Sequence, residues 1–162
     1  MSIAVDLCAA IPEKSSVPPF STKFSPSSSQ AGTGSAAIRR RMLPNSRLVK
    51  IERLRHAAGE PFALEVCYLS AEEFGGLTSA PLARSSLFST LERDFGIELA
   101  HADEEVDATP ADARIAELLG VQRGAPLLRI RQVIYSTKGK ATIYVLGFYR
   151  SDRHTLLIRR FR

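Results

Sequence analysis

The sequence has no tryptophan, an aromatic content of 7%, two cysteines and three histidines. So few aromatic residues offer no stacking platform for nucleic-acid bases. Cys8 and Cys67 lie far apart and outside any CxxC spacing, and the histidines show no metal-ligand spacing. We therefore expect no metal and no cofactor, and we expect Cys67 to behave as a small hydrophobic residue in a sheet.

Long apolar runs are also missing. No stretch approaches the roughly 20 residues that a membrane-spanning helix needs, so we expect no membrane partner. The short apolar stretch at the amino terminus is interrupted by Asp6 and is not preceded by basic residues. A signal peptide is not expected, and a reducing cytoplasm is the natural compartment.

Several catalytic signatures are absent. The sequence contains no GxGxxG, GxxxxGK[ST], GxSxG or HExxH pattern. No spacing nominates a nucleophile and its base. The residues therefore give no sign of an enzyme.

The charge is moderately positive. The 162 residues carry a formal net charge of +5, with a pI of about 9.6. The densest basic clusters are residues 39–41 and 159–162. This balance permits an anionic partner, and nonspecific attraction of nucleic acid to the basic termini stays open as one alternative.

Composition divides the chain in two. Residues 1–45 are rich in serine and proline, which predicts a disordered segment without helix or strand. Residues 46–162 show dense apolar periodicity, and their length suits one folded domain with its own core.

The stretch from Leu48 to Leu69 predicts a β-hairpin, because two strand-like runs flank the turn-forming residues 57–61. Alternation places Arg53 and Arg55 on the same face as apolar neighbours, and Glu65 returns roughly level with them. A guanidinium is costly to bury without an anion. The hairpin is therefore either a solvated edge with ordinary surface charges or one wall of an anion site.

The remaining pattern predicts helices inserted between antiparallel strands. Ser70 is expected to cap a short helical turn at residues 71–74, and a serine to cap a helix that ends at Gly96. Thr109 is expected to begin a helix that stops at Gly120. Strands are expected at residues 126–136, 142–150 and 155–161. The fold class is α+β with an antiparallel sheet.

The polar residues of the predicted sheet faces suit a small anionic ligand, because arginine forks match phosphate or carboxylate groups. This set is Arg53, Arg55, Glu65, Ser86, Arg131, Tyr144 and Tyr149.

These pieces occur in a familiar order. Residues 47–162 resemble the UTRA domain, the effector-sensing module of GntR-family transcription regulators of the HutC subfamily. The matching segments are residues 51–55, Gly59-Glu60-Pro61 with Glu65 and Tyr68-Leu69, residues 86–88, Leu91-Glu92 with residues 95–97, Ala116 with residues 119–121, residues 124–128 and residues 149–153.

The resemblance implies a chorismate-lyase-like α+β fold that binds a small phosphate- or carboxylate-bearing effector. It also implies a homodimer whose geometry alters the DNA affinity of a separate winged helix-turn-helix domain. By position, Arg53 and Arg55 match the anion-binding arginines, Glu65 the carboxylate that contacts polar groups of the ligand, and Ser86 a hydroxyl donor. Phe88 and Tyr149 fall where aromatic residues of the family's pocket occur, and Tyr144 joins the expected effector site from the polar residues of the sheet faces.

Three residues differ from the family pattern. Phe88 stands where tyrosine is frequent, Ile143 where amino-sugar-phosphate sensors carry glutamate, and His154 where another aromatic residue is common. Residues 1–45 resemble neither the winged helix-turn-helix domain nor the first strand of the sensing domain. We therefore expect a truncated regulator that reaches DNA only through a domain absent from this chain. The alternative on the same fold is a chorismate-lyase-like enzyme.

Overall fold

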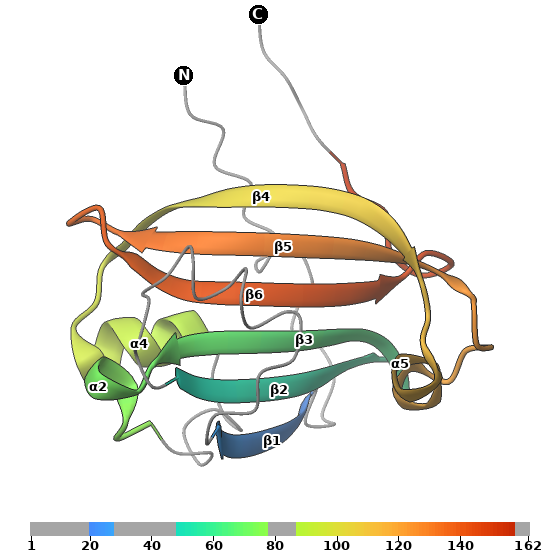
Figure 1. The fold of residues 1–162 in the computed structure, drawn as a ribbon, viewed down its shortest axis with the longest axis horizontal. Coiled ribbons are helices and arrows are strands. Elements are labelled where there is room, and N and C mark those ends of the chain that lie inside the picture. The colour runs from blue at the N-terminus through green and yellow to red at the C-terminus, as the bar shows by residue number, and fades with distance from the viewer. Residues whose placement is uncertain (1–19, 28–47, 78–86, 158–162) are drawn as a thin grey trace, which may run out of the picture.

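The computed structural model describes residues 20–27, 48–77 and 87–157. Its strands form a six-stranded antiparallel sheet in the order β1-β2-β3-β6-β5-β4 (Figure 1). The strands are β1 (Phe20–Ser27), β2 (Leu48–Ala57), β3 (Glu60–Ser70), β4 (Leu99–Pro110), β5 (Pro126–Ser136) and β6 (Ala141–Arg150), and the helices are α2 (Ala71–Phe74), α4 (Leu87–Phe95) and α5 (Ala113–Leu119). The α+β antiparallel fold is confirmed.

Strand β1 corrects one expectation. It pairs with β2 along its whole length, from Phe20 opposite Arg55 to Ser27 opposite Leu48. The prediction of no strand before residue 46 is therefore wrong at Phe20–Ser27, and β2 has a neighbour on its outer side. Serine and proline content obscured this strand, yet Pro26 is compatible with a strand at the sheet edge, where one ladder donor is dispensable. Where the folded unit begins stays a prediction.

The β2–β3 hairpin follows the sequence pattern closely. Ala58 and Gly59 both adopt positive φ, 51° and 82°, as a tight two-residue hairpin turn requires. The register places Ile51 opposite Cys67 and Arg53 opposite Glu65. The predicted placement of Arg53 and Arg55 on one face, with Glu65 roughly level with them, is confirmed.

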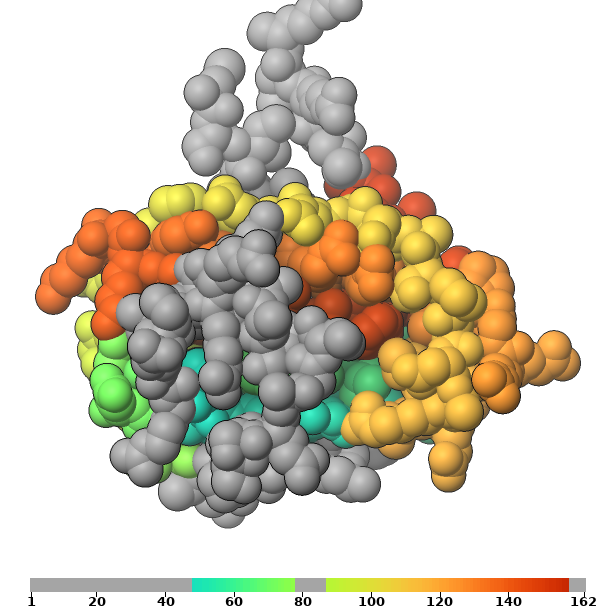
Figure 2. Space-filling model, viewed as in Figure 1, coloured from blue at the N-terminus to red at the C-terminus, as the bar shows by residue number. Residues whose placement is uncertain are grey.

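Two apolar clusters cover the two faces of the sheet. On one side, which we call the α4 face, Leu87 and Leu91 pack against β2, β3 and β6. On the other side, the α5 face, Ile115 and Leu119 pack against Leu64 and neighbouring strand residues. Figure 1 shows α2 and α4 at one end of the sheet and α5 at the other, and in Figure 2 the yellow-orange atoms of α5 and its following loop stand at that second end.

One helix boundary and one helix cap differ from prediction. Helix α5 begins three residues later than expected, because Thr109 and Pro110 belong to β4 and Asp112 is the N-cap, with its carboxylate accepting from the Ile115 amide at 2.7 Å. Ser70 makes no capping bond to α2 and is buried. The predicted ends are confirmed: Gly120 closes α5 in the left-handed conformation, and Gly96 follows α4 with a φ of 63°.

The carboxyl-terminal strand was not found where expected. The segment from Thr155 to Leu157, which follows the turn after β6, has no regular structure. The remainder of that predicted strand lies outside the described residues.

Candidate functional site

Four polar side chains gather on the α4 face beyond the apolar cluster. Arg53 and Arg55 come from β2, Glu65 from β3 and Tyr149 from β6. Arg53 lies directly opposite Glu65, and Ala63 lies opposite both Arg55 and Tyr149. We call Arg53, Arg55, Glu65 and Tyr149 the polar cluster.

Glu65 is the centre of this cluster. Its Oε1 accepts a hydrogen bond from Arg55 Nη1 at 2.8 Å and another from the Tyr149 hydroxyl at 2.9 Å. Glu65 and Arg53 are each 6% exposed, and Tyr149 is 7% exposed. A carboxylate this deeply buried is stable only when charged or polar partners replace its lost water. The two guanidinium groups and one carboxylate leave the cluster with a formal positive charge.

A glycine allows Tyr149 to reach Glu65. Gly147 lies opposite Glu65 in the β3–β6 register, two residues before Tyr149 on the same face. A Cβ at position 147 would come within 2.5 Å of Tyr149 Cε2 and 3.1 Å of its hydroxyl. The ring therefore passes over the space that a side chain at residue 147 would fill. A glycine inside a strand often marks such a close approach.

A β-bulge adds an aromatic ring. The β2–β3 register skips Phe62, because Arg55 pairs with Ala63 and His56 with Pro61. Phe62 consequently packs with Ala63 and Tyr149. Its ring centroid lies 5.7 Å from Cζ of Arg55, within cation–π range.

His154 lies against the cluster from the segment after β6. Its ring stacks on Tyr149 with centroids 4.5 Å apart. Burial lowers the pKa of the imidazole, and the charge of Arg55 lowers it further, while Glu65 opposes both effects. The neutral imidazole is therefore favoured at this position.

The structure separates Tyr144 from the other predicted site residues. Tyr144 lies on the α5 face, where it packs with Val133 and stands 6.3 Å from Tyr68, ring centroid to ring centroid. The reason is the two-residue period of a strand: positions 144 and 149 differ by an odd number and point to opposite faces. Tyr144 is thus not part of the polar cluster.

The other predicted members have different outcomes. Phe88 lies on α4 and packs against the apolar cluster of the α4 face. Ser86 lies outside the described residues. Arg131 lies on the α5 face, where it pairs with Glu105 and Asp107 on β4. The neighbouring Arg129 donates to the Asp107 carboxylate and holds its pKa below its usual range.

Sequence reasoning missed three contributors to the site. Phe62 joins the site through a β-bulge, which no residue type in the sequence predicts. His154 stands out in the sequence only as a departure from the family pattern. Gly147 carried a usable signal, since glycine is uncommon inside a strand that is otherwise rich in apolar and aromatic residues.

Two negative findings apply to the described part of the chain. No group of three or more histidine, cysteine, aspartate or glutamate side chains there could hold a metal ion. Among the helices that the structure describes, none is both long and apolar enough to cross a membrane.

The described part of the chain is thus an α+β module with an antiparallel sheet, helices on both faces, and an arginine–glutamate cluster on one face. The sequence model of the UTRA domain matches residues 25–155. The chain belongs to the UTRA domain family.

Relatives agree with this assignment. The chain is 33% identical over 112 residues to the HTH-type transcriptional repressor NagR of Bacillus subtilis, an alignment that covers 69% of this chain and 46% of NagR. The chain thus spans about half the length of the curated relatives it matches. The aligned relatives are transcription regulators.

Solved structures show the same fold. A putative transcriptional regulator from Streptomyces coelicolor superimposes with a TM-score of 0.73 at 29% identity, covering 89% of this chain and 96% of that one. The ligand-binding domain of a putative GntR-family regulator from Bordetella bronchiseptica gives 0.72 at 26% identity, covering 91% and 95%. The chain is therefore homologous to effector domains of GntR-family regulators.

Proposed function

We propose that this chain binds a small anionic effector at the polar cluster and does not transform it chemically. The observation that carries the proposal is the placement of two arginines, the buried Arg53 and the largely buried Arg55, beside the buried carboxylate of Glu65. Guanidinium forks bind phosphate and carboxylate groups through paired, charge-assisted hydrogen bonds. In a buried setting such bonds are weakly screened by salt.

The residues have distinct roles in this proposal. The arginines hold the anionic group, and Glu65 accepts hydrogen bonds from neighbouring polar groups of the ligand. Tyr149 and Phe62 fix Glu65 and Arg55 in place. Ser86, the residue before α4, and Phe88 belong to the proposed site on the resemblance alone.

Regulation is the second part of the proposal. The relatives are named as helix-turn-helix regulators, and the part of them aligned here is less than half of their length. We propose that effector binding in this module changes the DNA affinity of a separate DNA-binding part. We also propose a cytoplasmic homodimer as the acting form. Support for the dimer comes from β4, the outermost strand of the described sheet at one edge, which spans twelve residues.

Thermal unfolding with added anions tests the binding function. A ligand that binds only the folded state at 100 times its Kd stabilises that state by about 2.7 kcal/mol. Inorganic phosphate, small phosphate esters and dicarboxylates are the first probes. Arg55→Lys keeps the charge but loses the fork, so the shift in Tm should shrink for this variant.

The matched control is Arg123→Ala. Arg123 is exposed, so this substitution removes a guanidinium, and one more charge than Arg55→Lys does, at a place remote from the polar cluster. Its variant should show the full shift in Tm with each probe. Equal shifts in the Arg55 and Arg123 variants would place the anion elsewhere, and release of pyruvate from added chorismate would favour the enzyme alternative.

A further inference from the structure

His154 has a buried nitrogen that the fold leaves unsatisfied. Its Nε2 is inaccessible to solvent and makes no hydrogen bond within the part of the chain that the structure describes. A buried polar atom without a hydrogen-bond partner destabilises the folded state. A ligand that supplies the missing hydrogen bond would explain why this atom is left unpaired.

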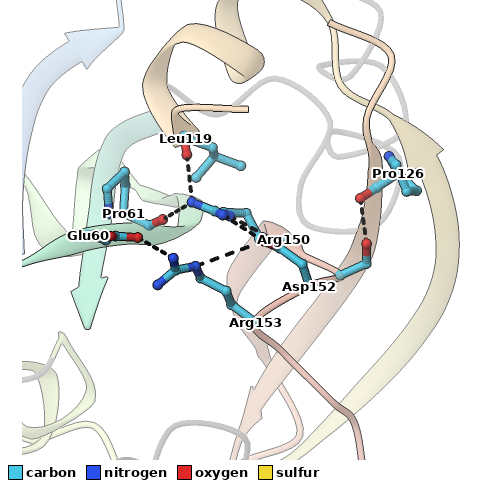
Figure 3. Close-up of polar contacts among 8 residues, drawn as sticks. Glu60, Pro61, Leu119, Pro126, Arg150, Asp152 and Arg153 are labelled. Carbon is cyan, nitrogen blue, oxygen red and sulfur yellow. Dashed lines mark hydrogen bonds and ion pairs between the residues drawn. The ribbon is translucent and has the colours of Figure 1, made fainter. Parts of the chain in front are cut away.

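Several bonds anchor the turn that precedes His154. Arg150, at the end of β6, donates from Nη1 to the carbonyl oxygens of Pro61 at 3.3 Å and Leu119 at 3.4 Å (Figure 3). Ser151 Oγ donates to the Pro126 carbonyl at 2.9 Å. These bonds tie the end of β6 to the starts of β3 and β5 and to the end of α5.

A further ion pair secures the turn itself. Arg153, the residue before His154, pairs with Glu60 at the start of β3 (Figure 3). The side chains of Arg150 and Asp152 also pair, at 2.7 Å. His154 therefore leaves a turn whose position is set by several independent contacts, so its ring is preorganised beside the cluster.

The imidazole faces the groups that the proposed effector would contact. It stacks on Tyr149 from β6, and its electrostatic neighbours are Arg55 from β2 and Glu65 from β3. Arg53, opposite Glu65, is the remaining charged group of the cluster. A ligand that reaches Arg55 and Glu65 thus comes close to His154.

We propose that His154 is a specificity-determining contact of the effector site, its Nε2 hydrogen-bonding a polar group adjacent to the anionic group of the ligand. This inference rests on the proposed function of the polar cluster. It names the ligand class more narrowly: a small metabolite whose phosphate or carboxylate is followed by a hydroxyl or amide group. A simple anion lacks that second group and leaves Nε2 unsatisfied.

The alternative is that His154 serves only as a stacking partner for Tyr149. Phenylalanine would serve that role equally well. His154→Phe removes the nitrogen and keeps the ring, whereas His154→Gln keeps a polar nitrogen near the same place. The two variants therefore separate hydrogen bonding from stacking.

Two probes that differ by the second group provide the test. Inorganic phosphate offers only the anion, and glycerol 3-phosphate adds neighbouring hydroxyl groups. In His154→Phe we expect the affinity for glycerol 3-phosphate to fall about tenfold, the loss of one good hydrogen bond. The affinity for inorganic phosphate should change less than about threefold, and His154→Gln should recover part of the loss.

Nitrogen-15 spectra of the histidine side chains give an independent readout on the unaltered chain. Glycerol 3-phosphate should shift the Nε2 resonance of His154, assigned by its absence in His154→Phe, and leave His56 and His101 unmoved. This inference alone is overturned if glycerol 3-phosphate binds in an Arg55-dependent way, binds His154→Phe as tightly as the wild type, and leaves the His154 resonances unmoved. Failure of both probes to bind overturns the proposed function as well.

Discussion

The ring of Tyr149 occupies the space that a side chain at Gly147 would need. A Cβ on residue 147 would lie 2.5 Å from Tyr149 Cε2, well inside van der Waals contact. The ring passes over Gly147 and brings its hydroxyl to Glu65 Oε1, which Arg55 also contacts. Because residue 147 is a glycine, the Tyr149 hydroxyl can donate a second hydrogen bond to the buried Glu65 carboxylate.

Gly147→Ala should displace Tyr149 and break its bond to Glu65. Introducing a methyl group into such a packed position typically costs about 1–3 kcal/mol. We expect the free energy of unfolding, measured by urea denaturation, to fall by that amount. Gly76→Ala is the control, because no atom lies within 4 Å of a Cβ at that position. Equal effects of the two substitutions would mean that the close approach is unimportant.

Much of the fold could be predicted because strand and turn signals are local. The alternation from Val49 to Arg55 and the turn at Gly59 fixed the hairpin, and Gly120 marked the end of α5. The start of α5 could not be chosen locally, since both Thr109 and Asp112 are good caps. Pairing with β5 decides it, because Thr109 lies opposite Leu127 in the sheet.

The site was partly predictable for the same reason. Arg53, Arg55, Glu65 and Tyr149 come together as expected, since the two-residue period and the hairpin register place them on one face. The same period, applied to β6, would have excluded Tyr144. The position of Phe62 depends on a β-bulge, and that of His154 on long-range contacts of the turn after β6. No local sequence pattern predicts either position.

Arg55 and Glu65 should be strongly coupled in stability. Removing one member of a buried ion pair leaves the other uncompensated, which costs about 3–5 kcal/mol. Arg55→Met and Glu65→Gln should therefore each destabilise the fold. The double variant should be less destabilised than the sum of the two single variants. Urea denaturation of the four proteins gives the coupling energy.

The exposed pair Arg93 and Asp94 provides the comparison for that cycle. The two side chains lie 2.7 Å apart, Nε to Oδ1, but both are exposed to solvent. Their coupling energy should be much smaller than that of Arg55 and Glu65, because solvent screens both charges. A coupling energy for Arg55 and Glu65 no larger than that of the exposed pair would contradict the importance of their burial.

Asp112→Ala should weaken α5 and the cluster it covers. The carboxylate caps the Ile115 amide at 2.7 Å, and Ile115 packs on the α5 face. Loss of such a cap costs about 0.5–2 kcal/mol. Thermal unfolding should show a lower Tm for this variant, whereas Asp103→Ala on the exposed face of β4 should leave the Tm unchanged. Replacement by asparagine or serine at residue 112 should restore most of the loss.

His154 should make the stability of the fold depend on pH. Burial, with the charge of Arg55, lowers the pKa of His154 in the folded state below its ordinary value of 6.5. Between these two pKa values the unfolded chain binds more protons than the folded one, so protonation favours unfolding. The stabilising contribution is full above about pH 6.5 and is lost as the pH falls towards the folded-state pKa.

The measurement is the free energy of unfolding as a function of pH in the wild type and in His154→Phe. The difference between the two proteins should grow in favour of the variant as the pH falls below the ordinary histidine range, because phenylalanine takes up no proton. His101→Phe is the control, since His101 is exposed and stacks on Tyr135 at the sheet edge. A wild-type profile parallel to that of His154→Phe would contradict a partly buried, neutral imidazole at residue 154.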